Sequence, residues 1–166
     1  MVTTGKITEE MISYFGKDTR RIAHFLKVYG YAKTIGELEG ISEEKQYILE
    51  VTALMHDIGI KVSEKKYNSS AGNYQELEGP AEAEKILKKL GMPENIIERV
   101  KFLIAHHHTY NEVDNIDYRI LIEADFLVNA AEDNMEKKAI QAVKDKIFRT
   151  KTGIQLLEVQ FLADER

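Results

Sequence analysis

The chain has 166 residues, of which 43% are hydrophobic and 31% charged, and its formal net charge is -5 at pH 7. This composition is typical of one soluble globular domain, long enough to bury most of the surface that its unfolded chain would expose. The negative charge argues against binding to nucleic-acid polymers or anionic membranes, since both need a positive surface. The absence of cysteine excludes disulfides, thiolate ligands and a cysteine nucleophile.

Nothing in the sequence points to a membrane or to export. No apolar run approaches the ~18 to 20 residues that span a bilayer, and the N-terminus lacks a basic-then-apolar signal pattern. The lack of cysteine also fits a reducing compartment. We therefore expect a cytoplasmic protein whose partner is a small molecule, and an oligomer is compatible with these features.

Apolar residues recur at helical spacing along most of the chain, whereas strand patterns are almost absent. A short helix is expected over residues 8–15. Asp18 caps the next helix, which stops near residues 36–40. Ser42 opens a third helix, and Gly59 is expected to end it.

The middle of the chain predicts two loops and two helices. Residues 61–79 show no clear period and predict a long loop, which in compact domains is usually functional or disordered. Pro80 predicts the first position of a helix that Gly91 closes. Pro93 starts the next helix, which runs to a histidine triplet, and a second loop follows over residues 109–117.

The last part of the chain continues the helical pattern after a helix that carries Asp125. A charged stretch over residues 132–146 predicts a helix with one face in solvent, the inward residues being Ala139, Ile140, Val143 and Ile147. A final helix is expected over residues 154–162. The sequence thus predicts an all-α, single-domain helical bundle over residues 1–166, with a motif-bearing core at about 18–133 and C-terminal helices at 134–166.

All five histidines and two aspartates lie in apolar stretches of the chain. Their order is His24, then His56 with Asp57, then the triplet at residues 106–108, then Asp125. A lone buried histidine or aspartate is more often a satisfied core residue or a helix cap, but several ligand types on separate helices favour a metal site. Imidazole with carboxylate suits Fe, Mn, Ni, Co or Zn better than Ca or Mg.

This order, together with the segment Leu-Met-His-Asp-Ile-Gly that ends at Gly59, resembles the HD superfamily of metal-dependent phosphohydrolases over about residues 20–125. The resemblance implies a helical bundle with a metal at its centre and a ligand set that comprises His24, His56, Asp57 and Asp125. It also implies that metal-activated water cleaves a phosphate ester or phosphoanhydride of a small molecule, for which we expect a nucleotide. His56 and Asp57 would then be catalytic as well as ligands.

The chain departs from the family pattern at two positions. Family members often carry a lysine directly after His-Asp-Ile-Gly, whereas here Ile60 takes that place and Lys61 follows. A catalytic contact of Lys61 with phosphate and an ordinary loop lysine both stay open. Members with two metals often have a histidine before Gly-Pro, and this chain has Glu78 there. Glu78 is either a ligand or an acid favoured by the helix dipole.

Helical spacing ranks the histidines of the triplet. His107 shares the buried helix face of Ile97, Val100 and Ile104, so it is the first candidate to point inward, with His108 next, whereas His106 is expected to point sideways or to solvent. We therefore expect one tightly held ion and a second, weaker ion about 3.5 to 4 Å away. Asp57 would bridge the two ions, and Glu78 with His107 or His108 would hold the second.

Candidates for substrate binding flank these ligands. Arg20 and Arg21 lie one turn before His24 and would offset phosphate charge, as would Lys65 and Lys66 in the expected loop. Tyr74 and Tyr110, with Tyr67, would stack on a nucleobase. For each of these residues, an ordinary surface role is the competing interpretation.

Two other functions stay open from the sequence. The first is a non-catalytic module that binds a metal or senses a ligand, in which the same side chains hold the helices together. The second is a di-iron oxygenase, because some proteins that resemble this family use a mixed-valent iron pair in that way.

Overall fold

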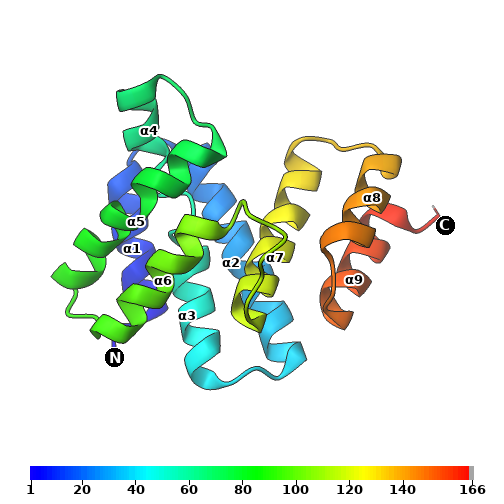
Figure 1. Cartoon of the computed structure of the whole chain (residues 1–166), viewed down its shortest axis with the longest axis horizontal. Helices are drawn as coiled ribbons and strands as arrows, with labels where there is room; N and C mark the ends of the chain where they lie inside the picture. The colour runs from blue at the N-terminus through cyan, green and yellow to red at the C-terminus, as the bar shows by residue number, and fades with distance from the viewer. Residues whose placement is uncertain (165–166) are drawn as a thin grey trace.

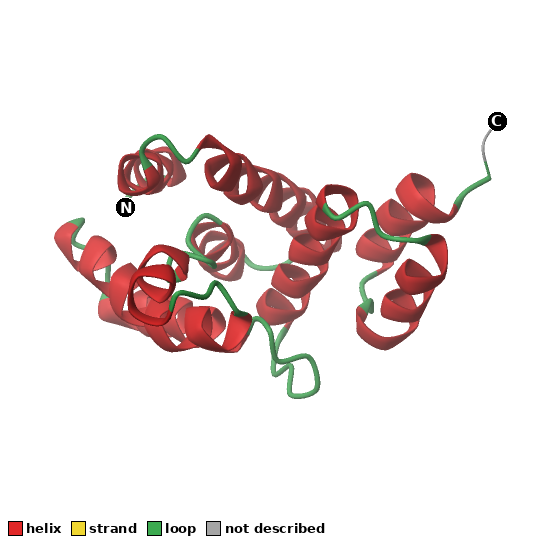
Figure 2. Ribbon diagram, turned by 90° about the horizontal axis from the view of Figure 1, so that it is seen from above, coloured by secondary structure: helices red, strands yellow, loops and turns green. Residues whose placement is uncertain are grey.

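The computed structural model describes residues 1–164, which form helices joined by short loops, with no strand in this range (Figures 1 and 2). The all-α prediction is therefore confirmed. None of the helices described is long and apolar enough to cross a membrane. In chain order the elements are α1 (Thr4–Phe15), α2 (Thr19–Glu39), α3 (Glu43–Ala53), α4 (Ile60–Tyr67), α5 (Gly72–Lys89), α6 (Glu94–His106), α7 (Ile116–Glu132), α8 (Lys137–Ile147), α9 (Lys151–Leu157) and the π-helix η1 (Glu158–Leu162).

Helix α7 is the central element of the bundle. It packs against α2 and α3 on one side and against α8 and α9 on the other (Figure 1). Most of its residues are buried, including the charged Asp117, Glu123 and Asp125. A helix that is buried on nearly every side lies within a core rather than on its surface, so acidic groups on α7 need partners inside the protein.

The ends of α2 and α3 follow the sequence signals. Asp18 accepts a hydrogen bond from the backbone N–H of Arg21, and Ser42 accepts one from that of Lys45, as N-cap residues do. Gly40 ends α2 with a φ of 68°, a left-handed conformation that favours glycine. These caps fix where the chain leaves α2 and begins the helix that leads to His56.

The prediction of a long loop over residues 61–79 is wrong. Helix α4 follows directly after Gly59, and only residues 68–71 separate it from α5. Pro80 lies inside α5 rather than at its start. A proline removes one hydrogen bond from a helix interior, but here α5 packs along α4 and α6 on either side of the proline. This packing outweighs the local signal.

The C-terminal helices were predicted with shifted boundaries. Helix α8 begins at Lys137, five residues after the expected start, and Ile140 and Ile147 are buried on it as predicted. Ala139 is exposed, so its expected inward position is wrong. The helix expected over residues 154–162 is divided into α9 and η1. Together α8, α9 and η1 stand beside α7 at the right of Figure 1.

We predict that Gly59→Ala destabilises the fold, because a Cβ at Gly59 would lie 2.6 Å from the backbone nitrogen of Gly79 and 2.8 Å from the carbonyl oxygen of Gln75. Backbone atoms cannot move aside as a flexible side chain does, so we expect the free energy of unfolding to fall by about 1 to 3 kcal/mol. Urea unfolding of metal-free protein measures this change.

Gly30→Ala is the matched control for this substitution. Gly30 lies inside α2, and a Cβ at this position would have no neighbouring atom within 4 Å, so alanine should stabilise the helix by about 0.5 to 1 kcal/mol. Equal unfolding midpoints for Gly59→Ala and wild type would show that the two backbones do not approach this closely.

Candidate metal centre

Four side chains from α2, α7 and the turn after α3 converge on one point. The Nε2 atom of His24 lies 3.2 Å from both His56 Nε2 and Asp125 Oδ1, and 3.6 Å from Asp57 Oδ2. His56 Nε2 lies 3.3 Å from Asp57 Oδ2 and 3.2 Å from Asp125 Oδ1. The structure therefore brings together, with one donor atom each, the four side chains of the expected minimal ligand set.

Acceptors on the outer side of each ring fix the orientation of the imidazoles. His56 Nδ1 lies 2.8 Å from the carbonyl oxygen of Ala53, and His24 Nδ1 lies 2.7 Å from Glu132 Oε1. A carbonyl or carboxylate oxygen only accepts, so Nδ1 carries the proton in both rings. The two Nε2 atoms therefore face the centre, in the arrangement of metal-binding histidines that a neighbouring group orients.

Asp57 faces a second group of donors with its other oxygen. Its Oδ1 lies 2.9 Å from His107 Nε2 and 3.8 Å from His108 Nε2. His107 Nδ1 donates to the carbonyl oxygen of Ile104 at 2.7 Å, so this ring also turns its Nε2 inward. Asp57, His107 and His108 form a second set able to hold a cation, and Asp57 belongs to both sets.

The centre favours positive charge. Burial alone would raise the pKa of Asp57, but the charge of His56, the hydrogen bond with His107 and the nearby His108 ring hold the pKa well below its usual range. Burial acts against the charged form of His56, yet Asp57 and Asp125 raise its pKa well above its usual value. Two carboxylates among inward-facing imidazoles thus favour a cation at the centre.

Two buried polar atoms at the centre lack a hydrogen-bond partner within residues 1–164, namely Asp125 Oδ1 and His108 Nε2. Buried polar groups are normally satisfied, and those that are not need an explanation such as an ion. One of these atoms belongs to each donor set. The donors are imidazole nitrogens and carboxylate oxygens, which suit a divalent transition metal, so the residues present fit such an ion.

The other two residues of the triplet differ in position, as the helical spacing predicts. His106 donates from Nδ1 to the carbonyl oxygen of Phe102 and stacks on its ring, with centroids 4.2 Å apart. It therefore lies outside both donor sets. His108 follows the end of α6, and its backbone N–H donates to Glu76 Oε2 at 3.2 Å.

The expectation that Glu78 is a metal ligand is not met. Its carboxylate accepts hydrogen bonds from Lys66 Nζ at 3.2 Å and from the Tyr67 hydroxyl at 2.8 Å. Because α5 begins at Gly72 and continues through Pro80, Glu78 lies within the helix and faces the end of α4. The Glu78 carboxylate is thus bound by Lys66 and Tyr67 and lies outside both donor sets.

Of the positively charged residues expected to bind phosphate, the arginines lie near the first donor set and Lys61 does not. Arg20 and Arg21 line a cavity of about 450 Å³ together with His24 and Asp57, next to the first donor set. Lys61 instead donates to the carbonyl oxygen of Tyr14 at 3.0 Å, with its ammonium group over the Tyr14 ring. The catalytic role expected for Lys61 is therefore not supported by its position, because α4 turns this side chain toward α1.

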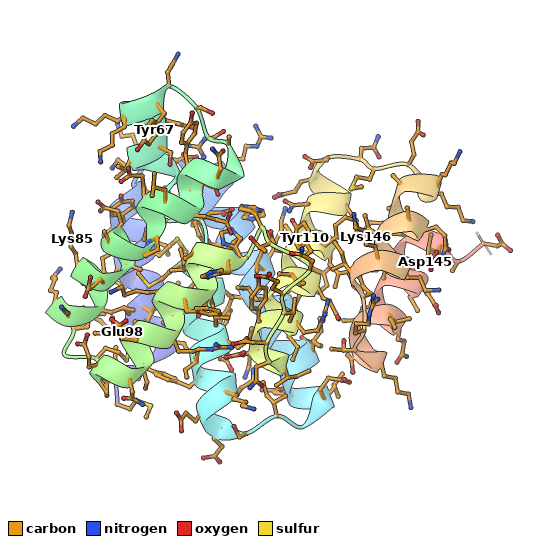
Figure 3. The ribbon with its side chains drawn as sticks, viewed as in Figure 1. Tyr67, Lys85, Glu98, Tyr110, Asp145 and Lys146 are labelled. Atoms are coloured by element: carbon orange, nitrogen blue, oxygen red, sulfur yellow. The ribbon has the colours of Figure 1, made fainter. Side chains whose placement is uncertain are left out.

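The tyrosines expected to stack on a base lie in different places. Tyr74 stacks on Tyr67 with ring centroids 4.2 Å apart, and Figure 3 shows Tyr67 at the outer end of the α4–α5 hairpin. Tyr74 is thus engaged away from the donor atoms. Tyr110 lies in the loop after the triplet and lines a second cavity together with His108.

Sequence reasoning missed Glu132 and Glu76, which support the donor side chains from outside. Glu132 lies two helical turns after Asp125 on the same face of α7, and this spacing was a usable signal. Its carboxylate fixes the outer nitrogen of His24. Glu76, which holds the backbone at His108, gave no signal because the helix that carries it was predicted as a loop.

Comparisons with known proteins agree with this geometry. The HD domain family matches residues 21–162, and the chain belongs to this family. Among solved structures it is similar to a predicted HD superfamily hydrolase from an uncultured Thermotogales bacterium. The TM-score is 0.67 at 22% identity, over 94% of this chain and 83% of the other. A comparison with curated proteins finds no match.

We predict that Asp57→Ala protein, unlike wild type, retains no metal on purification. The substitution removes the carboxylate that faces both donor sets and leaves the imidazoles without a balancing charge. Elemental analysis of freshly purified protein measures the change. Glu78→Ala is the matched control, because the structure places this carboxylate outside both sets, and it should keep wild-type metal content. Wild-type content in Asp57→Ala would contradict the assignment.

Glu132→Ala should weaken metal binding about 10- to 100-fold, the usual effect of removing a group that orients a histidine ligand. Glu132 contacts the outer nitrogen of His24 and the ammonium group of Lys27, neither of which is a donor atom, so the donor set itself stays intact. Competition with a chelating dye measures the affinity. Glu136→Ala, at a nearby exposed glutamate without a side-chain cap bond, should bind metal as wild type does. Equal affinities for the two variants would remove Glu132 from the site.

Proposed function

We propose that the protein is a metal-dependent phosphohydrolase that cleaves a phosphate ester or phosphoanhydride of a small molecule, with nucleotides as the substrate class. One observation carries this proposal. Asp57 turns its two oxygens to two sets of metal donors, and beside it lies an open cavity with two arginines. A site that only held helices together would have no need of a cavity at its metal donors.

The residues around this cavity have distinct tasks in hydrolysis. A divalent metal, when bound, supplies Lewis-acid activation of water and of a phosphoryl oxygen. The arginine side chains bind the remaining phosphate oxygens and offset their charge. Arg21 is held by ion pairs with Asp18 and Glu64, which fix its guanidinium group at the rim of the cavity, beside Arg20.

The geometry supports one tightly held ion and a second, weaker one. The first set offers four donor atoms, whereas the second offers only three and includes His108 at 3.8 Å from Asp57 Oδ1. Without Glu78, the second set has no carboxylate of its own besides the shared Asp57. Fewer donors and less negative charge mean lower affinity for a divalent cation.

A hydrolytic function also agrees with the name of the structural neighbour, which is called a predicted HD superfamily hydrolase. We extend that activity to this chain only as part of the proposal. No contact among residues 1–164 favours a di-iron oxygenase over hydrolysis, since the donor sets suit several transition metals alike.

The test is a hydrolysis assay with restored metal. Protein is first analysed for bound elements, then incubated with the metal found, or with Mn, Co or Ni, and a panel of nucleotides. We expect release of phosphate from at least one nucleotide, abolished by a chelator and by Asp125→Ala. Phosphate release measured colorimetrically reports the reaction.

Two results would overturn hydrolysis. Tightly bound metal without turnover of any phosphate compound would indicate a metal-binding or ligand-sensing module. An absorbing, oxygen-sensitive iron pair would indicate the oxygenase. Asp145→Ala, on the outer face of α8 (Figure 3), is a control that should hydrolyse nucleotides at the wild-type rate.

A further inference from the structure

A second cavity of about 650 Å³ lies beside the second donor set, which contributes His108 to its lining. One wall is the loop after α6, from His108 to Asn111. The opposite wall carries three cations, Arg119 of α7, Lys146 of α8 and Arg149 just before α9. Figure 3 shows Tyr110 and Lys146 next to each other between α7 and α8. The cavity therefore lies where the main bundle meets the C-terminal helices.

The two arginines of this cavity are held by neutral groups rather than by carboxylates. Arg119 donates to the carbonyl oxygen of Ile147 at 2.8 Å. Arg149 donates to the carbonyl oxygens of Asp145, Lys146 and Phe148. Within residues 1–164, none of the three cations forms an ion pair. Neutral acceptors thus hold the two guanidinium groups in place, and the charge of Glu123 acts on Arg119 only from a distance, without an ion pair.

Two other arginines of the protein, unlike those of the cavity, form ion pairs with carboxylates. Arg99 is bound by both Asp114 and Asp117, and Arg21 by Asp18 and Glu64. At the cavity, both oxygens of the buried Glu123 are taken by Thr150 and by backbone N–H groups. Burial lowers the pKa of Arg119; the negative charge of Glu123 acts against this, and the positive charge of Arg149 acts in the same direction as burial. An excess of positive charge in an acidic protein indicates an anionic ligand.

The cavity is connected to the metal centre through His108, one of its lining residues. His108 lines the cavity and also belongs to the second donor set, 3.8 Å from Asp57 Oδ1. Tyr110, two residues further along the same loop, also lines the cavity. A ligand at the donor atoms can therefore extend directly into the cavity.

We propose that this cavity binds a second phosphate group of the substrate, beyond the one that is cleaved. The inference rests on the proposed function and makes it more specific, since the substrate class becomes small molecules with two separate phosphate groups, such as nucleoside bisphosphates. Guanidinium groups match phosphate oxygens in geometry and charge. Thr109 and Asn111 add polar groups at the same wall.

The test uses Lys146→Gln. Lys146 is exposed, and its side chain makes no hydrogen bond within residues 1–164, so the substitution should leave the fold intact. We expect wild type to prefer adenosine 3′,5′-bisphosphate over adenosine 5′-monophosphate in kcat/KM. Lys146→Gln should reduce this preference about three- to tenfold, as loss of a charged hydrogen bond does, and Lys146→Arg should restore it. Lys138→Gln, at an exposed lysine of the same helix outside the cavity, should keep the preference.

Binding of inorganic phosphate, followed by phosphorus NMR on the protein as purified, is the second measurement and needs no turnover. Weaker phosphate binding in Lys146→Gln than in Lys138→Gln supports the subsite, even if no ester is hydrolysed and the proposed function fails. If wild type, Lys146→Gln and Lys138→Gln hydrolysed the two nucleotides with the same preference, the subsite would be overturned but the proposed hydrolase would stand. Equal phosphate affinity in all proteins would also overturn it.

Discussion

The position of Asp57 depends on a contact between two backbones. A Cβ at Gly59 would lie 2.6 Å from the backbone nitrogen of Gly79 in α5, and a Cβ at Gly79 would lie 2.7 Å from the side chain of Ile104 in α6. This contact fixes the turn between α3 and α4, and with it the direction of both Asp57 oxygens. Because α5 also packs along α6, the same contact sets the distance from Asp57 to His107. The donor sets therefore form together, as a consequence of helix packing.

A buried carboxylate makes the corresponding connection on the C-terminal side. Glu123 of α7 is fully buried and accepts hydrogen bonds from the Thr150 hydroxyl and from the backbone N–H groups of Arg149 and Thr150. Burial raises its pKa despite these bonds, so its place in the core has an energetic cost that such bonds must offset. Since α7 also carries Asp125, Glu123 fixes Arg149 relative to the metal centre. A Cβ at Gly153 would meet Glu123, which keeps this position small.

Local patterns were enough to predict the helical class and the side chains that converge, because apolar setting and helical spacing are properties of short segments. The inward position of His107 followed from its phase on α6, although the role of the donors as ligands stays a prediction. Glu78 was expected at the start of a helix because it precedes Gly-Pro. Packing against neighbouring helices instead lets α5 extend on both sides of Pro80, so Glu78 lies inside the helix. The partners of Glu132 and Lys61 lie far away in sequence, on α2 and α1, and no local pattern reveals them.

The two cavities beside the centre differ in charge, which favours one orientation of a charged ligand. On the His24 side, Asp18 and Glu132 lie beside Arg20 and Arg21, so positive and negative groups largely cancel. On the His108 side, the cations face only polar and aromatic groups. Complementary charge sets orientation more strongly than it sets affinity. Under the proposed function, a substrate would place the phosphate that is cleaved at the donor atoms, within reach of Arg20 and Arg21, and the remaining negative end of the molecule toward α8.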